Sequence, residues 1–238
     1  MIRKTGLFGN IEKYSPNIAV LDEDNEFSYE YLLSAASKIS DQIESRCVAL
    51  ISCSNSIESL AAYVGFLRKR IVPILTNRNL DLSLLTKIIE AYKPEYLFLP
   101  SDKESISLDY KVVFSYKNYF LLKSQKIIKY KIHEDLSLLL STSGSTGSPK
   151  YVRQSYRNIL ANTKSISNYL DITDNDRAIT TMPMSYTYGL SIINTHLFNG
   201  ASIILNENSL INKKFWEIIR SKNATNFGGV PYSYEILK

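Results

Sequence analysis

The stretch Ser141-Thr142-Ser143-Gly144-Ser145-Thr146-Gly147-Ser148-Pro149-Lys150 decides the fold class. Its ten residues hold six hydroxyl side chains and two glycines, and the apolar segment Leu136 to Leu140 precedes it. In such a turn, backbone N–H groups and hydroxyls converge on phosphate oxygens, and Lys150 supplies a positive charge that can follow them. A buried strand, this turn and a helix over 155–170 therefore predict an anion-binding loop in an α/β fold.

Other phosphate and nucleophile motifs do not match this loop. A Walker loop requires Gly, four residues and then Gly-Lys-Ser/Thr, but Pro149 occupies the place of the second glycine counted from Gly144. A dinucleotide fingerprint needs three spaced glycines, and the hydrolase elbow needs Gly-x-Ser-x-Gly; neither pattern is present. A flexible linker is disfavoured because a strand leads directly into the loop and a helix follows it.

Upstream and downstream of the loop, strand and helix patterns alternate with short connections. This alternation predicts mainly parallel sheets flanked by helices. The expected strands cover 19–21, 48–51, 71–75, 96–99, 136–140, 177–181 and 201–205. The expected helices cover 28–43 with Ser28 as its cap, 56–67, 81–92, 155–170, a segment ending near Gly200, and 213–220.

The pattern changes between residues 111 and 132, where short Tyr-, Phe-, Val- and Ile-rich segments indicate hairpins. Within it, the alternation of Lys126, Lys129 and Lys131 with apolar residues predicts a strand with one solvated face. We take this region as the seam between a first α/β subdomain, 1–132, and a second one, 133–238, that contains the phosphate loop.

The last residues predict a second sheet that is cut short. Phe227 to Pro231 indicates a strand and a turn, and Tyr232 to Lys238 indicates the first turns of a helix without a stop signal. If strands are missing from this sheet, its edge and the apolar faces of the helices at 190–198 and 215–219 should be exposed.

Composition excludes several classes of protein. The 238 residues are 45% hydrophobic, so the chain can bury a sizeable core without a disulfide or metal. The net charge of +5 is scattered, and the basic run Arg68-Lys69-Arg70 follows an apolar helix, where it opposes the helix dipole; we therefore expect no nucleic-acid partner. Neither a secretory signal nor an apolar run of about 18 residues is present, which predicts a cytoplasmic location and no membrane span.

Cysteine and histidine positions indicate structural roles. Cys47 and Cys53 match neither a zinc pair nor a redox Cys-x-x-Cys and are expected to be reduced core thiols. The two histidines, His133 and His196, are isolated, and no metal site or Ser/His/Asp set is predicted.

Several segments together resemble the adenylate-forming superfamily, which includes acyl-CoA ligases, luciferases and peptide-synthetase adenylation domains. The loop from Thr142 to Lys150 is similar to the signature of that family at nine consecutive positions. The segments that resemble further family motifs are Phe27 to Leu32, Ser155 to Ile159, Pro183 to Leu190, and Gly229 to Pro231. The resemblance runs from about residue 14 to the end and implies the N-terminal domain of such an enzyme.

The resemblance implies ATP-dependent activation of a small-molecule carboxylate. An acyl-adenylate would form, followed by a thioester with CoA or a carrier thiol, with ATP and Mg²⁺ as cofactors. Lys150 would be the catalytic residue. The expected phosphate-binding residues are Thr142, Ser143, Gly144, Ser145, Thr146, Gly147 and Lys150. The expected acyl-binding residues are Tyr186, Gly189 and Gly229.

Tyr186 and Tyr156 stand where the family often has His. Tyr186 is expected either to stack on the acyl group or to be a buried core tyrosine. The family also continues into segments that hold adenine, Mg²⁺ and ribose and into a C-terminal domain with a further catalytic lysine, none of which occurs by Lys238.

Three hypotheses about the function of this chain remain open. The first is the N-terminal part of a ligase that is incompetent alone and acts with a missing C-terminal half or a partner polypeptide. The second is a non-catalytic module that binds nucleotide or an acyl group. The third is a structural domain with a polar loop, for which Lys150→Ala would leave nucleotide affinity unchanged.

Overall fold

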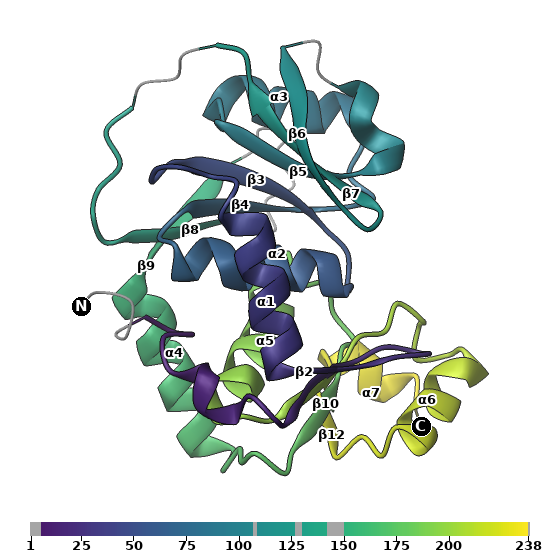
Figure 1. Cartoon of the computed structure of the whole chain (residues 1–238). Coiled ribbons are helices and arrows are strands. Elements are labelled where there is room, and N and C mark those ends of the chain that lie inside the picture. The colour runs from purple at the N-terminus through teal and green to yellow at the C-terminus, as the bar shows by residue number, and fades with distance from the viewer. Residues whose placement is uncertain (1–5, 107–108, 127–129, 142–149, 238) are drawn as a thin grey trace.

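Two mixed, mostly parallel β-sheets carry the fold (Figure 1). The computed structural model describes residues 6–106, 109–126, 130–141 and 150–237. The strands are β1 Ile18–Leu21, β2 Glu26–Ser28, β3 Val48–Cys53, β4 Val72–Asn77, β5 Tyr96–Pro100, β6 Tyr110–Tyr116, β7 Tyr119–Ser124, β8 Leu136–Ser141, β9 Tyr151–Ser155, β10 Arg177–Ile179, β11 Ser202–Ile204 and β12 Asn226–Phe227.

The helices alternate with the strands along most of the chain. The α-helices are α1 Tyr29–Ser40, α2 Ile57–Arg68, α3 Leu82–Tyr92, α4 Tyr156–Tyr169, α5 Thr187–Asn199, α6 Lys213–Ser221 and α7 Pro231–Glu235, and the 3₁₀ turns are η2 Ile11–Tyr14 and η3 Ser101–Ile106. The expected α/β class is therefore confirmed.

The strand order is β6-β7-β5-β3-β4-β8-β9 in the larger sheet and β12-β10-β11-β1-β2 in the smaller one. Strands β5, β3, β4 and β8 are parallel, and so are β12, β10, β11 and β1. Strands β6, β7, β9 and β2 join their neighbours in antiparallel pairs. The hairpin predicted after residue 111 is confirmed by the β6–β7 pair.

Helices separate the two sheets and also cover their outer faces (Figure 1). The main core contains residues of α1, α2 and α5 packed against β3 on one side and β1, β10 and β11 on the other. A second core joins the outer face of the larger sheet to α3, and a third joins the smaller sheet to α6. The result is a five-layer arrangement in which α1, α2 and α5 form the central layer.

Side-chain caps fix where most helices begin. Ser28 accepts a hydrogen bond from the N–H of Tyr31, so the predicted cap of α1 is confirmed. Ser155 caps α4 through a reciprocal capping box with Asn158. Each cap satisfies an N–H group that the helix itself cannot pair.

The structure corrects two expectations about individual segments. Lys126 and residues 130–132 belong to no strand, so the strand predicted from the lysine alternation is wrong in the part that the structure describes. Instead, the segment passes beside β3, where the N–H of Val48 donates to the Tyr130 hydroxyl at 3.2 Å. The backbone N–H of Val48 is thus paired with a side chain of this segment and not with a further strand.

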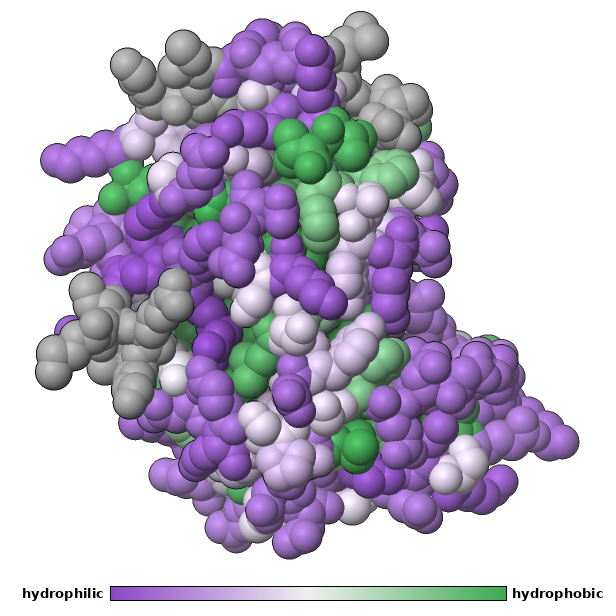
Figure 2. Space-filling model, in the orientation of Figure 1, coloured by the Kyte–Doolittle hydropathy of each residue, from purple (hydrophilic) through white to green (hydrophobic). Residues whose placement is uncertain are grey.

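The expected exposure of apolar helix faces is also wrong. Leu190, Ile193 and Leu197 of α5 are buried in the main core, and Phe215 of α6 is buried in the third core. The face in Figure 2 is accordingly mostly hydrophilic, with an apolar patch over β6, where Val112 and Val113 are exposed. Burial of α5 between two sheets supplies the partner that the sequence pattern did not reveal.

Residue 132 does not separate the two sheets. Strands β8 and β9 follow it but extend the larger sheet through the β4–β8 pair, whereas β1 and β2 precede it and lie in the smaller sheet. The chain therefore crosses between the two sheets on both sides of residue 132. The division into subdomains 1–132 and 133–238 stays a prediction.

The two cysteines lie in the interior. Cys47 and Cys53 are buried and free, as expected of core thiols.

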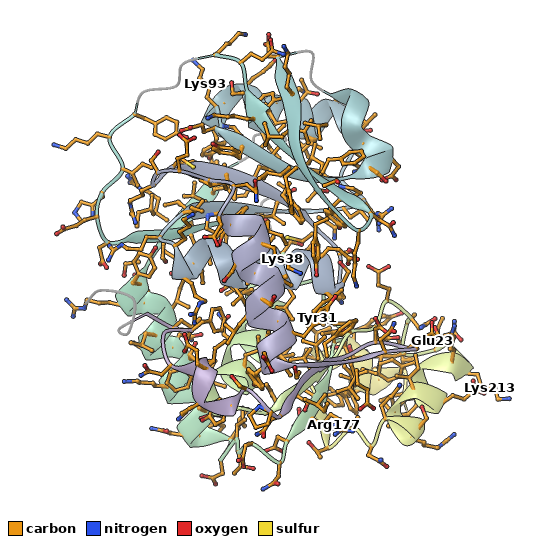
Figure 3. The ribbon with its side chains drawn as sticks, viewed as in Figure 1. Glu23, Tyr31, Lys38, Lys93, Arg177 and Lys213 are labelled. Carbon is orange, nitrogen blue, oxygen red and sulfur yellow. The ribbon has the colours of Figure 1, made fainter. Side chains whose placement is uncertain are left out.

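An ion pair joins the β1–β2 turn to α6. Glu23 in this turn pairs with Lys214 at 2.6 Å, and Figure 3 shows Glu23 close to the N-terminal end of α6, near Lys213. Both carboxylate and ammonium are about half exposed, so this ion pair contributes little stability.

Candidate functional site

The predicted phosphate loop connects two paired strands. Thr142, Ser143, Gly144, Ser145, Thr146 and Gly147 lie outside the described residues, but both ends of the loop are described. Ser141 at the end of β8 lies opposite Tyr151 at the start of β9, and Lys150 is exposed next to Tyr151. The loop is therefore a hairpin connection followed by α4, whereas the sequence indicated a direct turn from strand to helix.

Arginine side chains anchor the segment that leads into β8. The guanidinium of Arg46 donates to the carbonyl oxygens of His133 at 2.8 Å, Leu136 at 2.7 Å and Arg70 at 3.0 Å. The Arg70 guanidinium donates to the carbonyl of Glu134. The loop before β3 and the turn before β4 thus hold the backbone that precedes the phosphate hairpin. Sequence reasoning did not assign this role to Arg46.

Arg70 also reaches the start of α4. Its guanidinium lies 4.9 Å from the centre of the Tyr156 ring, and the N–H of Tyr156 donates to Asp135 at 3.1 Å. Burial raises the pKa of the Tyr156 hydroxyl, so this phenol stays neutral. Tyr156 therefore has a structural position at the junction between the segment before β8 and α4.

The acyl-site residues Tyr186 and Gly189 form the N-terminal end of α5. Tyr186 is the N-cap residue and is 52% exposed, which excludes a buried core tyrosine. Gly189 is buried, and a Cβ at this position would lie 2.4 Å from the carbonyl oxygen of Pro183. Only glycine lets the segment before α5 fold back this closely over the first helical turn.

Gly229 lies next to the same end of α5. The carbonyl of the preceding Gly228 accepts a hydrogen bond from Thr181, just after β10, and a Cβ on Gly228 would lie 2.8 Å from the Tyr188 hydroxyl. The structure therefore brings the segment after β12 together with the first turn of α5. Sequence reasoning did not single out Tyr188 or Gly228, although both lie within or beside the quoted motifs.

The two groups of site residues come from different sheets. Lys150 precedes β9 of the larger sheet, whereas Tyr186, Gly189 and Gly229 follow strands β10 and β12 of the smaller sheet. In α/β proteins, ligands bind beyond the carboxyl ends of parallel strands, and β8, β10 and β12 all end at these segments. Each group of predicted site residues therefore follows the carboxyl end of a strand in its own sheet.

No metal centre is found among the residues that the structure describes: they include no group of three or more His, Cys, Asp or Glu side chains able to hold an ion. His196 is buried in α5, where its Nδ1 lies 2.8 Å from the carbonyl oxygen of Ile192. Burial lowers the pKa of His196, which keeps the ring neutral. None of the helices in the described ranges is long and apolar enough to cross a membrane.

Among curated proteins, the chain is similar to ligases at low sequence identity. The chain is 23% identical over 198 residues to the 2-succinylbenzoate--CoA ligase of Bacillus subtilis, covering 80% of this chain and 41% of that protein. It is 22% identical over 215 residues to a D-alanine--D-alanyl carrier protein ligase of Staphylococcus aureus, covering 90% of this chain and 44% of that protein. The chain thus spans less than half the length of these relatives.

Comparison with solved structures supports the fold. ATP-bound MatB from Rhodopseudomonas palustris superposes with a TM-score of 0.81 at 21% identity, covering all of this chain and 51% of MatB. The model of the AMP-binding enzyme family matches residues 7–237. Because this match includes nearly the whole sequence, the chain belongs to the AMP-binding enzyme family.

Proposed function

We propose that this chain supplies the phosphate-binding and acyl-binding half of an ATP-dependent carboxylate-activating enzyme. The observation that carries the proposal is the position of the phosphate-loop motif between the paired strands β8 and β9, in a chain that matches the AMP-binding family over residues 7–237. Lys150 is exposed at the end of this hairpin, where it can reach a phosphate oxygen.

The proposed reaction has two steps. The substrate carboxylate attacks the α-phosphorus of ATP, the bond to the β-phosphate oxygen breaks, and an acyl-adenylate and pyrophosphate form. A thiol of CoA or of a carrier then attacks the acyl carbon and displaces AMP. Because the carboxylate is already ionised at neutral pH, the main task is to bring two anions together and to stabilise the departing pyrophosphate.

The residues of this chain have distinct tasks in that scheme. Lys150 and the loop Thr142 to Gly147 bind the phosphates, and removal of one such donor typically costs about 3 kcal/mol of transition-state stabilisation. Tyr186 flanks the acyl group, and Gly189 and Gly229 let the backbone approach it. Since the described residues offer no acidic ligand set, Mg²⁺ enters the proposal only as part of the substrate MgATP.

Activity is proposed for the complete site, to which this half contributes. The relatives are about twice as long as the region that the chain matches, so we expect weak MgATP binding and little turnover from these 238 residues alone. A second half, joined to this one or on a separate polypeptide, would complete the site.

The proposed place of action is the cytoplasm. Free Cys47 and Cys53 are consistent with action in this reducing compartment.

Calorimetric titration with MgATP tests the phosphate site. Lys150→Ala should weaken MgATP binding at least tenfold, whereas Lys164→Ala, which removes an exposed lysine from α4, should leave it unchanged. Equal affinities for Lys150→Ala and the unmodified chain would refute the phosphate site and favour a structural domain with a polar loop.

ATP–pyrophosphate exchange separates the ligase from the alternative function. The alternative, a non-catalytic nucleotide- or acyl-binding module, is favoured by the half-length match to the relatives. If addition of the second half restores exchange, the chain is part of a ligase. If MgATP binds but exchange stays absent with every acid tested, the binding module is the better assignment.

A further inference from the structure

One side chain from the larger sheet bonds to segments that follow two strands of the smaller sheet. Asn55 lies just after β3, and its Nδ2 group donates to the carbonyl oxygens of Met182 at 3.3 Å and Asn206 at 3.1 Å. Its Oδ1 accepts from the N–H of Met184 at 3.2 Å. Met182 and Met184 follow β10, and Asn206 follows β11. Asn55 therefore joins the carboxyl ends of β3, β10 and β11.

These three contacts require a side chain that is both a donor and an acceptor. A carbonyl oxygen can only accept a hydrogen bond, and a backbone N–H can only donate one. The asparagine amide has two donor hydrogens on Nδ2 for the two carbonyls and an acceptor oxygen for the N–H of Met184. A carboxylate at position 55 could bond to Met184 but not to Met182 or Asn206.

The loop that carries Asn55 is itself held in place. Ser56 caps α2 by accepting from the N–H of Ser59 at 3.4 Å, and the N–H of Ser54 donates to the Ser59 hydroxyl at 3.1 Å. The N–H of Asn55 donates to Oε1 of Glu207 at 3.3 Å. A side chain on such a fixed loop can position its partners, because its own backbone has little freedom to follow them.

Asn55 bonds to the segment that carries two of the proposed acyl-binding residues. Its partners Met182 and Met184 lie on either side of Pro183. The Pro183 carbonyl accepts from the N–H of Tyr186 at 3.0 Å, and it is the group that a Cβ on Gly189 would meet at 2.4 Å. Asn55 thus fixes the turn that precedes Tyr186 and lies over Gly189.

The proposed reaction joins groups that are held by different sheets. The α-phosphorus of ATP would lie at the β8–β9 hairpin of the larger sheet, whereas the acyl group would lie at the start of α5, which follows β10 of the smaller sheet. Strand β3 pairs with β4, and β4 pairs with β8, so the loop of Asn55 belongs to the same sheet as the phosphate hairpin. A misplacement of about 1 Å between reacting groups can lower a rate about 100-fold.

We propose that Asn55 is a positioning residue that holds the acyl-binding segment before α5 at a fixed distance from the phosphate hairpin. The role in catalysis rests on the proposed function. The clamp itself, which consists of Asn55 with Met182, Met184 and Asn206, can be tested on the chain alone.

Amide hydrogen exchange tests the clamp. In Asn55→Ala the N–H of Met184 loses its acceptor and should exchange about tenfold faster, with rates taken relative to amides of β4 so that a general loss of stability cancels. Asn55→Asp keeps an acceptor oxygen and should retain the slow exchange of Met184. Unchanged relative exchange of Met184 in Asn55→Ala would overturn the clamp.

Tyr63→Phe is the matched control. It removes the hydroxyl that donates to Oδ1 of Asn194 at 3.0 Å, a buried bond that also joins α2 to α5 but does not involve the segment before α5. This variant should lower stability in urea denaturation and leave the relative exchange of Met184 unchanged.

Pyrophosphate exchange with the second half present tests the positioning role. Asn55→Ala and Asn55→Asp should each lower kcat about 100-fold and leave the KM for MgATP unchanged, whereas Tyr63→Phe should leave both constants unchanged. Full activity of Asn55→Asp, or an equal loss in Tyr63→Phe, would overturn the positioning role. Absence of exchange by the unmodified chain with every acid would refute the proposed function and the catalytic role with it, while the exchange rate of Met184 still decides whether the clamp exists.

Discussion

Substitution of Gly65 by alanine tests the closest packing in the central layer. Gly65 lies in α2 against α1, and a Cβ at this position would lie 2.3 Å from the carbonyl oxygen of Ala36 and 3.0 Å from its carbonyl carbon. Both atoms belong to the backbone of α1, so rotation of a side chain cannot relieve the contact. The two helices must separate by about 1 Å to restore a normal contact distance.

The size of the effect follows from two opposing terms. Overpacking of a rigid core costs about 3 kcal/mol at the upper end of its usual range, whereas replacement of a helical glycine by alanine gains about 1 kcal/mol in helix propensity. We therefore expect Gly65→Ala to lower the free energy of unfolding by about 2 kcal/mol. For a chain of this size, that corresponds to a fall in Tm of about 4–8 °C.

Urea denaturation, followed by far-ultraviolet circular dichroism, measures this effect. Ala36→Gly serves as the companion variant: it truncates the facing residue but leaves its carbonyl oxygen in place, so it should not rescue Gly65→Ala in the double variant. A Gly65→Ala protein as stable as the unmodified chain, or a full rescue by Ala36→Gly, would refute the backbone contact between α1 and α2.

Three further predictions concern buried polar groups. Tyr29→Phe should lower the free energy of unfolding by about 1–2 kcal/mol in thermal melts, because the carbonyl of Ala201 loses the buried hydroxyl that donates to it at 2.7 Å; an unchanged Tm would contradict this. Burial lowers the pKa of His196, so below about pH 6.5 the unfolded chain binds more protons and stability falls by up to about 1.4 kcal/mol per pH unit. His196→Gln should flatten the dependence measured by denaturation between pH 4.5 and 7, and an identical slope would exclude His196 as its source. Burial raises the pKa of Cys47 to about 12 and also raises that of Cys53, so both thiols should react with a disulfide reagent only after unfolding; fast labelling of the native chain would refute their burial.

The elements that the sequence predicted well depend on neighbours within a few residues. Ser28 was recognisable as a cap, and the start of the helix predicted over 155–170 agrees with its cap Ser155, because a cap bonds the N–H two or three positions along the same chain. The end of α5 at Gly200 was equally accessible, since Gly200 adopts a left-handed conformation with φ of 81°. Family membership followed from the contiguous loop motif at residues 142–150 in the same way.

The elements that the sequence missed depend on partners far along the chain. The strand β9 is short and half-exposed, and its identity as a strand comes from pairing with β8. Similarly, Arg46 has no motif around it, and its importance arises from the carbonyl groups of residues 133 and 136 that the fold brings to it. Such contacts cannot be inferred from local periodicity.

The sequence by itself therefore determined the α/β class, the main helices and the phosphate-loop motif, because hydrogen bonding and hydrophobic period act locally. Tertiary structure alone decided that β1 pairs with β11, that α5 is buried between two sheets, and that its N-terminal end meets the segment after β12. These outcomes require closure of long loops and packing of distant surfaces, which no segment encodes within its own residues.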